Sequence, residues 1–182
     1  MKTTDNLDEL FDVVDEKDNV IGKATRGEVH ENPRLIHRSV GVAVFNSKGE
    51  LFLQKRTATK DTDPLLWTIS CSGHVGLGDS YEETAVRELA EELGIKWDKG
   101  DKRGKRVGEL EYMTKFLYRS PIETEMAVLY KTVWDGGLRL QSEEIKEGKF
   151  FTQKALTEAL SKRKIVLSRY GKLTLAKLGW TA

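Results

Sequence analysis

The chain has 182 residues, and 38% of them are hydrophobic, which suits one compact domain with a single core. Its 30 Lys and Arg residues nearly balance 29 Asp and Glu residues, leaving a net charge of +1, so composition favours no nucleic-acid or membrane partner. One cysteine excludes an internal disulfide framework and suits a reducing compartment. No apolar run approaches membrane-spanning length, and the polar N-terminus lacks a signal core. We therefore expect a soluble, cytoplasmic protein.

The first half of the chain predicts two hairpins. Residues 10–25 alternate as two short strands around the turn residues Glu16 to Asn19. We expect residues 9–30 to form an N-terminal hairpin extension of a single domain that covers residues 1–182. Residues 38–56 predict a second hairpin, in which Asn46 to Gly49 form the turn.

One short strand is predicted after the second hairpin, over residues 66–72, LWTISCS. Strict alternation along this strand places Cys71 on the same face as Trp67 and Ile69. Ser72 then shares the opposite face with Thr68 and Ser70. A buried thiol with a structural role is the expected state of Cys71.

Residues 80–94 predict a helix with clear ends. Ser80 and Glu83 have the spacing of a capping box, and Gly94 is a typical C-terminal stop. An apolar stripe recurs every four residues at Ala85, Leu89 and Leu93. This stripe should face the protein core.

The same helix concentrates negative charge. Six carboxylates lie between Asp79 and Glu92, beside one basic residue, Arg87. Glu88, Glu91 and Glu92 project from one face at spacings where like charges repel. A solvated surface would explain most such helices, but the preceding GHVGLGD turn lets the backbone approach a ligand. Clustered carboxylates are also the ligands that Mg²⁺ or Mn²⁺ prefers, together with substrate phosphates.

The later segments complete a mixed pattern of strands and helices. Residues 96–108 are charged and aperiodic, which predicts a solvated loop without the interleaved aromatic residues of a nucleic-acid site. Strands are predicted over 108–119 and 123–134, and helices over 152–163 and 168–179. This arrangement indicates an α+β or α/β sandwich.

The glutamate helix and the turn before it resemble the Nudix box, the signature of the Nudix hydrolase superfamily. The matching positions are Gly73, Arg87, Glu88, Leu89, Glu91, Glu92, Gly94 and Ile95. Asp79 stands where the signature normally has Glu. The resemblance implies an α/β/α sandwich with a mixed β-sheet and metal-dependent hydrolysis of a diphosphate linked to another moiety. Cations and a diphosphate would then offset the charge of the helix.

A second resemblance is to isopentenyl diphosphate isomerase, a member of the same superfamily. It implies a metal site, for Zn²⁺, Mn²⁺ or Mg²⁺, at five positions: His30, His37, His74, Glu123 and Glu125. It also implies diphosphate-binding roles for Arg26, Arg56 and Lys60, and an aromatic position near Tyr170. Taken singly, each of these residues could be an ordinary surface group, but five metal-site matches in chain order favour the resemblance.

Two departures separate the chain from the isomerase pattern. The isomerase has a catalytic cysteine two residues before the third histidine, where this chain has Ser72. The isomerase also tends to carry a basic residue at the position of Glu88, whereas the RELAEE set is intact here. The prediction is therefore a hydrolase that is related to the isomerase.

The predicted activity is hydrolysis of a phosphoanhydride bond in a nucleoside diphosphate derivative or a related organic diphosphate. Mg²⁺ or Mn²⁺ on Glu88, Glu91 and Glu92 would bind the diphosphate, one carboxylate of the set, such as Glu92, would act as base, and Arg87 would orient the glutamates. A second Zn²⁺ or Mn²⁺ ion would occupy the histidine site, either as an inherited structural ion or as a second catalytic ion. The alternatives are an isomerase and a non-catalytic nucleotide-binding module. The partner is a small-molecule diphosphate, and a homodimer remains open.

Overall fold

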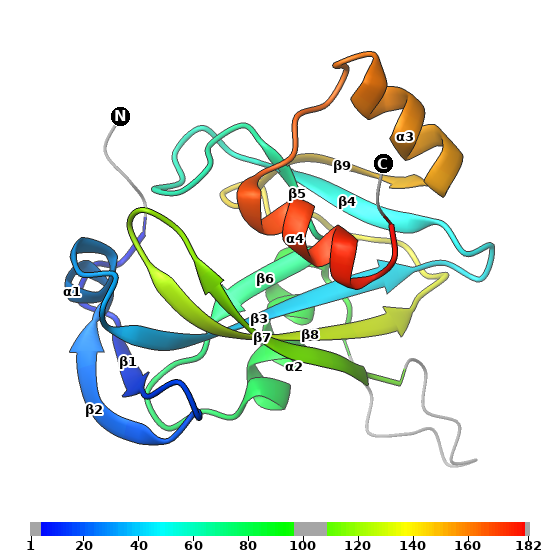
Figure 1. Ribbon diagram of the computed structural model, residues 1–182. Helices are drawn as coiled ribbons and strands as arrows, with labels where there is room; N and C mark the ends of the chain where they lie inside the picture. Colours follow the sequence, from blue (N-terminus) through cyan, green and yellow to red (C-terminus); the bar gives the residue numbers. More distant parts are fainter. Residues whose placement is uncertain (1–4, 97–108, 181–182) are drawn as a thin grey trace, which may run out of the picture.

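The computed structural model describes residues 5–96 and 109–180 (Figure 1). The predicted loop over residues 96–108 therefore lies outside the described residues, except for Lys96. The strands are β1 (Leu10–Val14), β2 (Val20–Thr25), β3 (Ile36–Phe45), β4 (Leu51–Arg56), β5 (Trp67–Thr68), β6 (Cys71–His74), β7 (Glu111–Arg119), β8 (Thr124–Val133) and β9 (Ile145–Phe151). The helices are α1 (Arg26–Glu31), α2 (Tyr81–Leu93), α3 (Gln153–Ser161) and α4 (Arg169–Lys177).

Strand β3 organises the mixed sheet. Along one side it pairs in parallel with β8 over its full length, from Ile36 opposite Thr124 to Phe45 opposite Val133. Its other side pairs successively with β1, β6 and β4, all antiparallel. Strand β7 extends the sheet beyond β8, and β9 extends it beyond β4. Residues from distant parts of the sequence thus meet at the start of β3.

Helices cover both faces of the sheet (Figure 1). On one face, Leu89 and Leu93 of α2 pack in a buried cluster with Val40 and Val42 of β3. On the other face, Ala43 belongs to a second cluster with Leu156 of α3 and Leu175 of α4. The alternation of β3 residues between two apolar clusters explains why this strand reads as an almost continuous hydrophobic run. The predicted α/β/α sandwich with a mixed β-sheet is confirmed.

The predicted ends of α2 agree with the structure. The Ser80 hydroxyl accepts a hydrogen bond from the Glu83 amide at 3.2 Å, and the Glu83 carboxylate accepts one from the Ser80 amide at 3.2 Å. Gly94 ends the helix in the left-handed conformation, with φ of 70°. A Cβ at this position would lie 2.9 Å from the Arg139 Cβ, so glycine is needed both for its conformation and for this close approach.

The prediction of one continuous strand over residues 66–72 is wrong. The chain leaves β5, which pairs with β4, and continues as β6, which pairs with β3. Between them, the Ser70 hydroxyl donates to the Phe52 carbonyl and accepts from the Val44 amide at 2.8 Å. Because the alternation restarts there, Cys71 packs in the α2 cluster, opposite the cluster that holds Trp67 and Ile69.

Two further elements differ from the sequence-based expectation. Residues 9–30 do not form strands alone, because Arg26–Glu31 form helix α1, capped by Thr25 and Glu28. Strand β9 was not predicted at all. Among the described residues, no helix is long and apolar enough to cross a membrane.

Candidate active site

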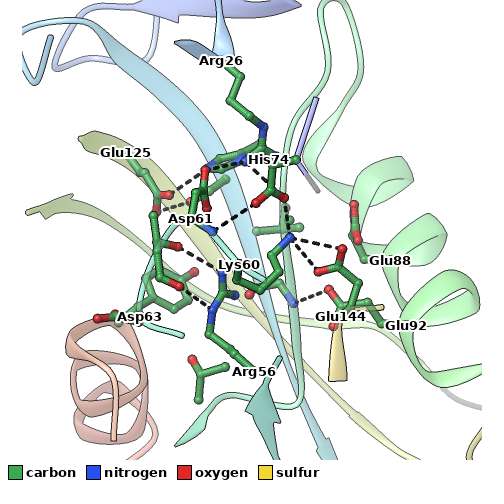
Figure 2. A pocket seen from close by; sticks show the side chains of 18 of the residues that line it. Arg26, Arg56, Lys60, Asp61, Asp63, His74, Glu88, Glu92, Glu125 and Glu144 are labelled. Atoms are coloured by element: carbon green, nitrogen blue, oxygen red, sulfur yellow. Dashed lines mark hydrogen bonds and ion pairs between the residues drawn. The ribbon is translucent and has the colours of Figure 1, made fainter. Parts of the chain in front are cut away.

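A cavity of about 330 Å³ opens where α2, the start of β3 and β8, and the β4–β5 loop meet. Figure 2 shows carboxylates, cationic side chains and His74 gathered around this space. All three glutamates of the predicted set line it, as do His74, Glu123 and Glu125. His74, Glu123 and Glu125 of the predicted histidine site therefore share one cavity with the glutamates, whereas His30 and His37 do not line it.

Helix α2 brings Glu88, Glu91 and Glu92 to the cavity wall. Glu91 is exposed, whereas Glu92 is buried and its carboxylate accepts a 2.6 Å hydrogen bond from the Gln54 amide nitrogen. Glu88 lies against β6, where a Cβ on Gly73 would come within 2.3 Å of the Glu88 Oε1. Glycine is thus required at position 73, because any side chain at that position would displace the Glu88 carboxylate.

The two inner glutamates hold protons more strongly than isolated carboxyl groups. Burial raises the pKa of Glu88 to about 7 against the opposing effect of Arg87, and the nearby Glu91 carboxylate adds to the rise. Burial and the nearby Glu88 carboxylate also raise the pKa of Glu92 well above its usual range. A cation placed among these oxygens would favour their charged forms. The donor set is all oxygen, which fits Mg²⁺ or Mn²⁺.

Arg87 and Asp79 form a pair outside the cavity lining. The Arg87 guanidinium donates to the Asp79 carboxylate at 2.6 Å and lies 3.9 Å from the Glu88 Oε1. Asp79, the position where the box departs from its usual Glu, is therefore long enough to reach Arg87. Arg87 contacts the glutamate set at its edge, and the Asp79 pair fixes its guanidinium beside Glu88.

The three histidines come together at one side of the cavity, and of the three only His74 lines it. Among the described residues, His30, His37, His74 and Glu123 each offer a ligand atom within 4.8 Å of the others. His30 Nε2 lies 3.0 Å from Glu123, and His74 Nε2 lies 3.1 Å from Glu125. His37 is fully buried, and neither of its ring nitrogens has a hydrogen-bond partner among the described residues. Buried imidazole nitrogens without partners are rare unless something binds them.

The electrostatics of this cluster fit a cation. Burial would lower the pKa of His30, but the carboxylates of Asp61 and Glu123 raise it to about 9. Burial would likewise lower the pKa of His74, but Glu123 and Glu125 outweigh it and raise that pKa. Burial and the neighbouring His74 hold the pKa of His37 well below its usual range. Nitrogen and oxygen donors in this mixture suit Zn²⁺ or Mn²⁺, which would replace the protons of His30 and His74.

The three predicted diphosphate-binding residues all line the cavity. Arg26 forms ion pairs with Glu9 at 3.2 Å and Asp61 at 3.6 Å. Arg56 donates to the carbonyl and hydroxyl oxygens of Thr62 at 2.9 and 3.0 Å. Lys60 lies near the centre of the view in Figure 2.

Sequence reasoning did not identify Asp5, Asp61 and Glu144 as residues of the cavity. Lys60 is paired with Asp5 and, at 2.8 Å, with Glu144. Asp61 lies 3.1 Å from His30 Nδ1. Asp5 and Asp61 belong to irregular segments, Glu144 lies in the turn before β9, and none of the three belongs to a recognisable motif. Lys60 was a local signal for such partners, because the charge of a buried lysine requires a carboxylate nearby.

The structure shows where the residues near Ser72 lie, the position at which the isomerase has its catalytic cysteine. Ser72 and Thr68 line the cavity, whereas Ser70 does not. Cys71 is fully buried outside it, and burial raises the pKa of its thiol well above the usual range. Tyr170 lines the cavity beside Tyr118, with ring centroids 5.3 Å apart and ring planes at 89°.

Comparisons with known proteins agree with this fold. The chain matches the model of the NUDIX domain over residues 35–170. It is 38% identical over 154 residues to an uncharacterized Nudix hydrolase of Pseudomonas aeruginosa, covering 84% of this chain and 85% of that protein. It is 34% identical over 135 residues to an isopentenyl-diphosphate Delta-isomerase of Serratia proteamaculans, covering 71% of this chain and 69% of that protein.

A solved structure extends the agreement to the fold. A crystal structure of a Deinococcus radiodurans protein superposes with a TM-score of 0.73 at 24% identity, over 91% of this chain and 96% of that one. The family-model match covers most of the chain, and its relatives include both hydrolases and isomerases. The chain therefore belongs to the Nudix family, and the prediction of a Nudix hydrolase acting on phosphoanhydride bonds, with isomerase-like relatives, is confirmed at that level.

Proposed function

We propose that the protein is a divalent-metal-dependent hydrolase of a nucleoside diphosphate derivative or a related organic diphosphate. One observation carries the proposal: the glutamates of α2 and the cations Arg26, Arg56 and Lys60 line the same cavity. Carboxylates and cations facing one space suit a metal-bound diphosphate, because the carboxylates would hold the ion and the cations would bind the phosphate oxygens.

Glu88, Glu91 and Glu92 would hold Mg²⁺ or Mn²⁺, and the histidine cluster with Glu123 and Glu125 would hold Zn²⁺ or Mn²⁺. Such ions, when bound, neutralise charge that develops on the phosphoryl oxygens and make water a stronger nucleophile at neutral pH.

The chain's own groups would position the substrate and move the proton. Lys60 and Arg56 would bind phosphate oxygens, and Lys60 would exchange its present carboxylate partners for them. Glu92 is the base we favour, since its oxygens are held by Gln54 at 2.6 Å and by the Ser72 amide at 3.4 Å. Arg87 would orient Glu88 from outside the cavity, with Asp79 fixing its guanidinium.

The histidine cluster specifically favours a second candidate, isopentenyl diphosphate isomerisation. That reaction requires an acid to protonate carbon, and Ser72 occupies the cavity position where a thiol would serve. A serine hydroxyl is a far weaker acid than a thiol. Cys71 points into the α2 core instead, so hydrolysis is the better supported of the two.

Phosphorus NMR separates the two candidates. The wild type is incubated with Mg²⁺ and, separately, with nucleoside diphosphates, sugar nucleotides and isopentenyl diphosphate. Hydrolysis predicts new monophosphate or phosphate signals that require the metal and disappear in Glu92→Gln. Rearranged isopentenyl diphosphate with both phosphates intact would instead identify an isomerase, and Cys71→Ala would then show whether the buried thiol takes part.

A further inference from the structure

His30 lies between two carboxylates that approach its ring from opposite sides. Its Nε2 lies 3.0 Å from Glu123, within the histidine cluster, and its Nδ1 lies 3.1 Å from the Oδ2 of Asp61. His30 and Glu123 are both members of the group whose ligand atoms converge, and Asp61 is not. Asp61 therefore contacts the cluster through Nδ1 of His30, the ring nitrogen that does not face Glu123.

The structure holds Asp61 firmly in this place. Asp61 belongs to the irregular loop between β4 and β5, and its side chain is 18% exposed. Its backbone amide donates to the Asp5 carboxylate at 3.2 Å, and its own carboxylate lies 3.6 Å from the Arg26 guanidinium. Figure 2 shows the Asp61 side chain directed toward the histidine side of the cavity. A loop residue restrained at both backbone and side chain can restrain its neighbour in turn.

We propose that Asp61 is a positioning residue for the histidine cluster: when a metal binds, its carboxylate, 3.1 Å from Nδ1, would accept the Nδ1 proton of His30 and so keep Nε2 as the ligand atom. A neutral imidazole carries its proton on one nitrogen only, and the partner of that nitrogen decides which one remains free. A carboxylate on Nδ1 fixes both the tautomer and the ring orientation, and increases the basicity of Nε2. The proposal rests on the metal-binding role proposed above for this cluster.

The chain offers a matched control. Asp63 lines the same cavity from the same loop, two residues away, and has the same charge. Its backbone is left-handed, with φ of 45°, a conformation that asparagine tolerates well. Asp63→Asn therefore removes one negative charge from the loop without removing the group that faces His30.

The experiment is a titration of Zn²⁺ by calorimetry into metal-free protein, with excess Mg²⁺ present to occupy the glutamates. Wild type, Asp61→Asn, Asp61→Ala and Asp63→Asn are compared, and thermal melting without Zn²⁺ first shows that each is folded. We expect Asp61→Ala to weaken binding about 10- to 100-fold, the usual effect of losing such a partner. Asp61→Asn should lose less, since its amide oxygen still accepts the proton. Asp63→Asn should stay within about twofold of wild type, because it leaves the carboxylate partner of His30 in place.

A second measurement tests whether Asp61 acts through His30. The visible absorption spectrum of Co²⁺-loaded protein reports the number and arrangement of ligands, and its shape should be the same in wild type and Asp61→Asn. A changed spectrum would make Asp61 a ligand and overturn the positioning role. Equal Zn²⁺ affinity in wild type and Asp61→Ala would also overturn it. If the wild type itself binds no Zn²⁺, the metal role of the cluster fails, and this proposal fails with it.

Discussion

Glu92 is buried beside Glu88, and the pKa values of both carboxyl groups are raised. A hydrogen bond from Gln54 and the amide of Ser72 hold the oxygens of Glu92 in place, so the carboxylate is positioned before any ligand arrives. In the metal-free protein, ionisation of these two neighbouring carboxyl groups is unfavourable and lowers the stability of the fold. Residues with this combination of burial and perturbed pKa are often functional.

Glu92→Gln should separate activity from stability. The change keeps the shape but removes a charge that binds metal or accepts a proton, so turnover should fall by about a hundredfold or more. The metal-free protein should be as stable as wild type or more stable at neutral pH, because Glu92→Gln removes a buried acid whose raised pKa costs stability once the unfolded chain ionises. Steady-state kinetics and urea unfolding measure the two effects. Glu82→Gln, on the exposed side of the same helix, is the control, and a Glu92→Gln enzyme as active as that control would exclude Glu92 from the reaction.

Glu88 should make the metal-free protein less stable as pH rises. Its pKa rises from the ordinary glutamate value of 4.5 to about 7 in the folded protein. Below pH 4.5 the group is protonated whether folded or unfolded. Between these values the unfolded chain ionises first, so stability is lost, by roughly 3 kcal/mol once the pH exceeds 7. Urea unfolding in a chelator at pH 5 and pH 8 should show a smaller loss for Glu88→Gln than for wild type; equal losses would contradict the assigned pKa.

Residues of the site were predictable where a motif fixes their spacing. Glu88, Glu91 and Glu92 follow from helical periodicity, and the capping box and Gly94 define the helix that carries them. Asp61 and Glu144 were not predictable, because they reach the cavity through irregular segments whose path depends on tertiary contacts. The histidines needed family resemblance, since no local pattern relates His30 to His74.

Among the elements, the turn between β1 and β2 contacts three other elements through Asp18. The Asp18 carboxylate accepts hydrogen bonds from Arg38 at 2.7 Å, from the Tyr81 hydroxyl at 3.0 Å and from Lys115. These partners belong to β3, α2 and β7. The turn therefore anchors the N-terminal hairpin to the sheet and to the start of the glutamate helix.

Asp18→Asn should destabilise the protein by about 1–3 kcal/mol, the usual effect of weakening partly buried hydrogen bonds to a charged group. Asparagine tolerates the left-handed backbone of this position, where φ is 68°, so the change tests charge alone. Burial would raise the pKa of Asp18, but hydrogen bonds from Lys115, Arg38 and Tyr81 outweigh burial and lower it. Its stabilisation is therefore present above pH 3.8, the ordinary pKa of an aspartate side chain, and lost as pH falls further.

Urea unfolding at pH 7 measures this effect. The control is Glu16→Gln in the same turn, whose side chain is 72% exposed and should change stability by less than about 0.5 kcal/mol. Equal stability of Asp18→Asn and this control would show that the three contacts contribute nothing net.

Element prediction failed where the chain changes neighbours. Residues 66–72 have the alternation of one strand, but they form two strands with different neighbours. Between them, hydrogen bonds of the Ser70 side chain replace backbone pairing, so β5 pairs with β4 and β6 pairs with β3. Helix α1 has six residues, too few for apolar periodicity to distinguish it from a hairpin end. Its capping box at Thr25 and Glu28 was the available signal.

At the scale of the whole molecule, the parallel pairing of β3 with β8 brings His37 opposite Glu125, 88 residues apart in the sequence numbering. A metal ion bound to the histidine cluster would join α1, β3, β6 and the start of β8. An ion that binds only the folded state stabilises it. The overall sandwich was predictable from sequence, but this convergence required the strand order.

Zn²⁺ or Mn²⁺ should raise the melting temperature of the wild type, and His37→Ala should reduce the shift. Ligation needs neutral imidazoles, and His30 keeps its proton up to a pKa of about 9. The shift should therefore grow as pH rises from about 6 to 9 and fade as pH falls. Thermal melting at several pH values, with and without metal, measures this. A shift that is independent of pH, or equal in His37→Ala, would place the ion elsewhere.

The central claim is that this cavity directs water to a phosphorus atom of a diphosphate. The most direct test is turnover in ¹⁸O-labelled water, with a substrate found by the phosphorus NMR screen and Mg²⁺ present. The isotope shift of the phosphorus signals shows which product gained labelled oxygen. The account predicts one ¹⁸O atom in one phosphate-containing product of each turnover, and none formed by Glu92→Gln at the same enzyme concentration. Product that contains no ¹⁸O on phosphorus would contradict it.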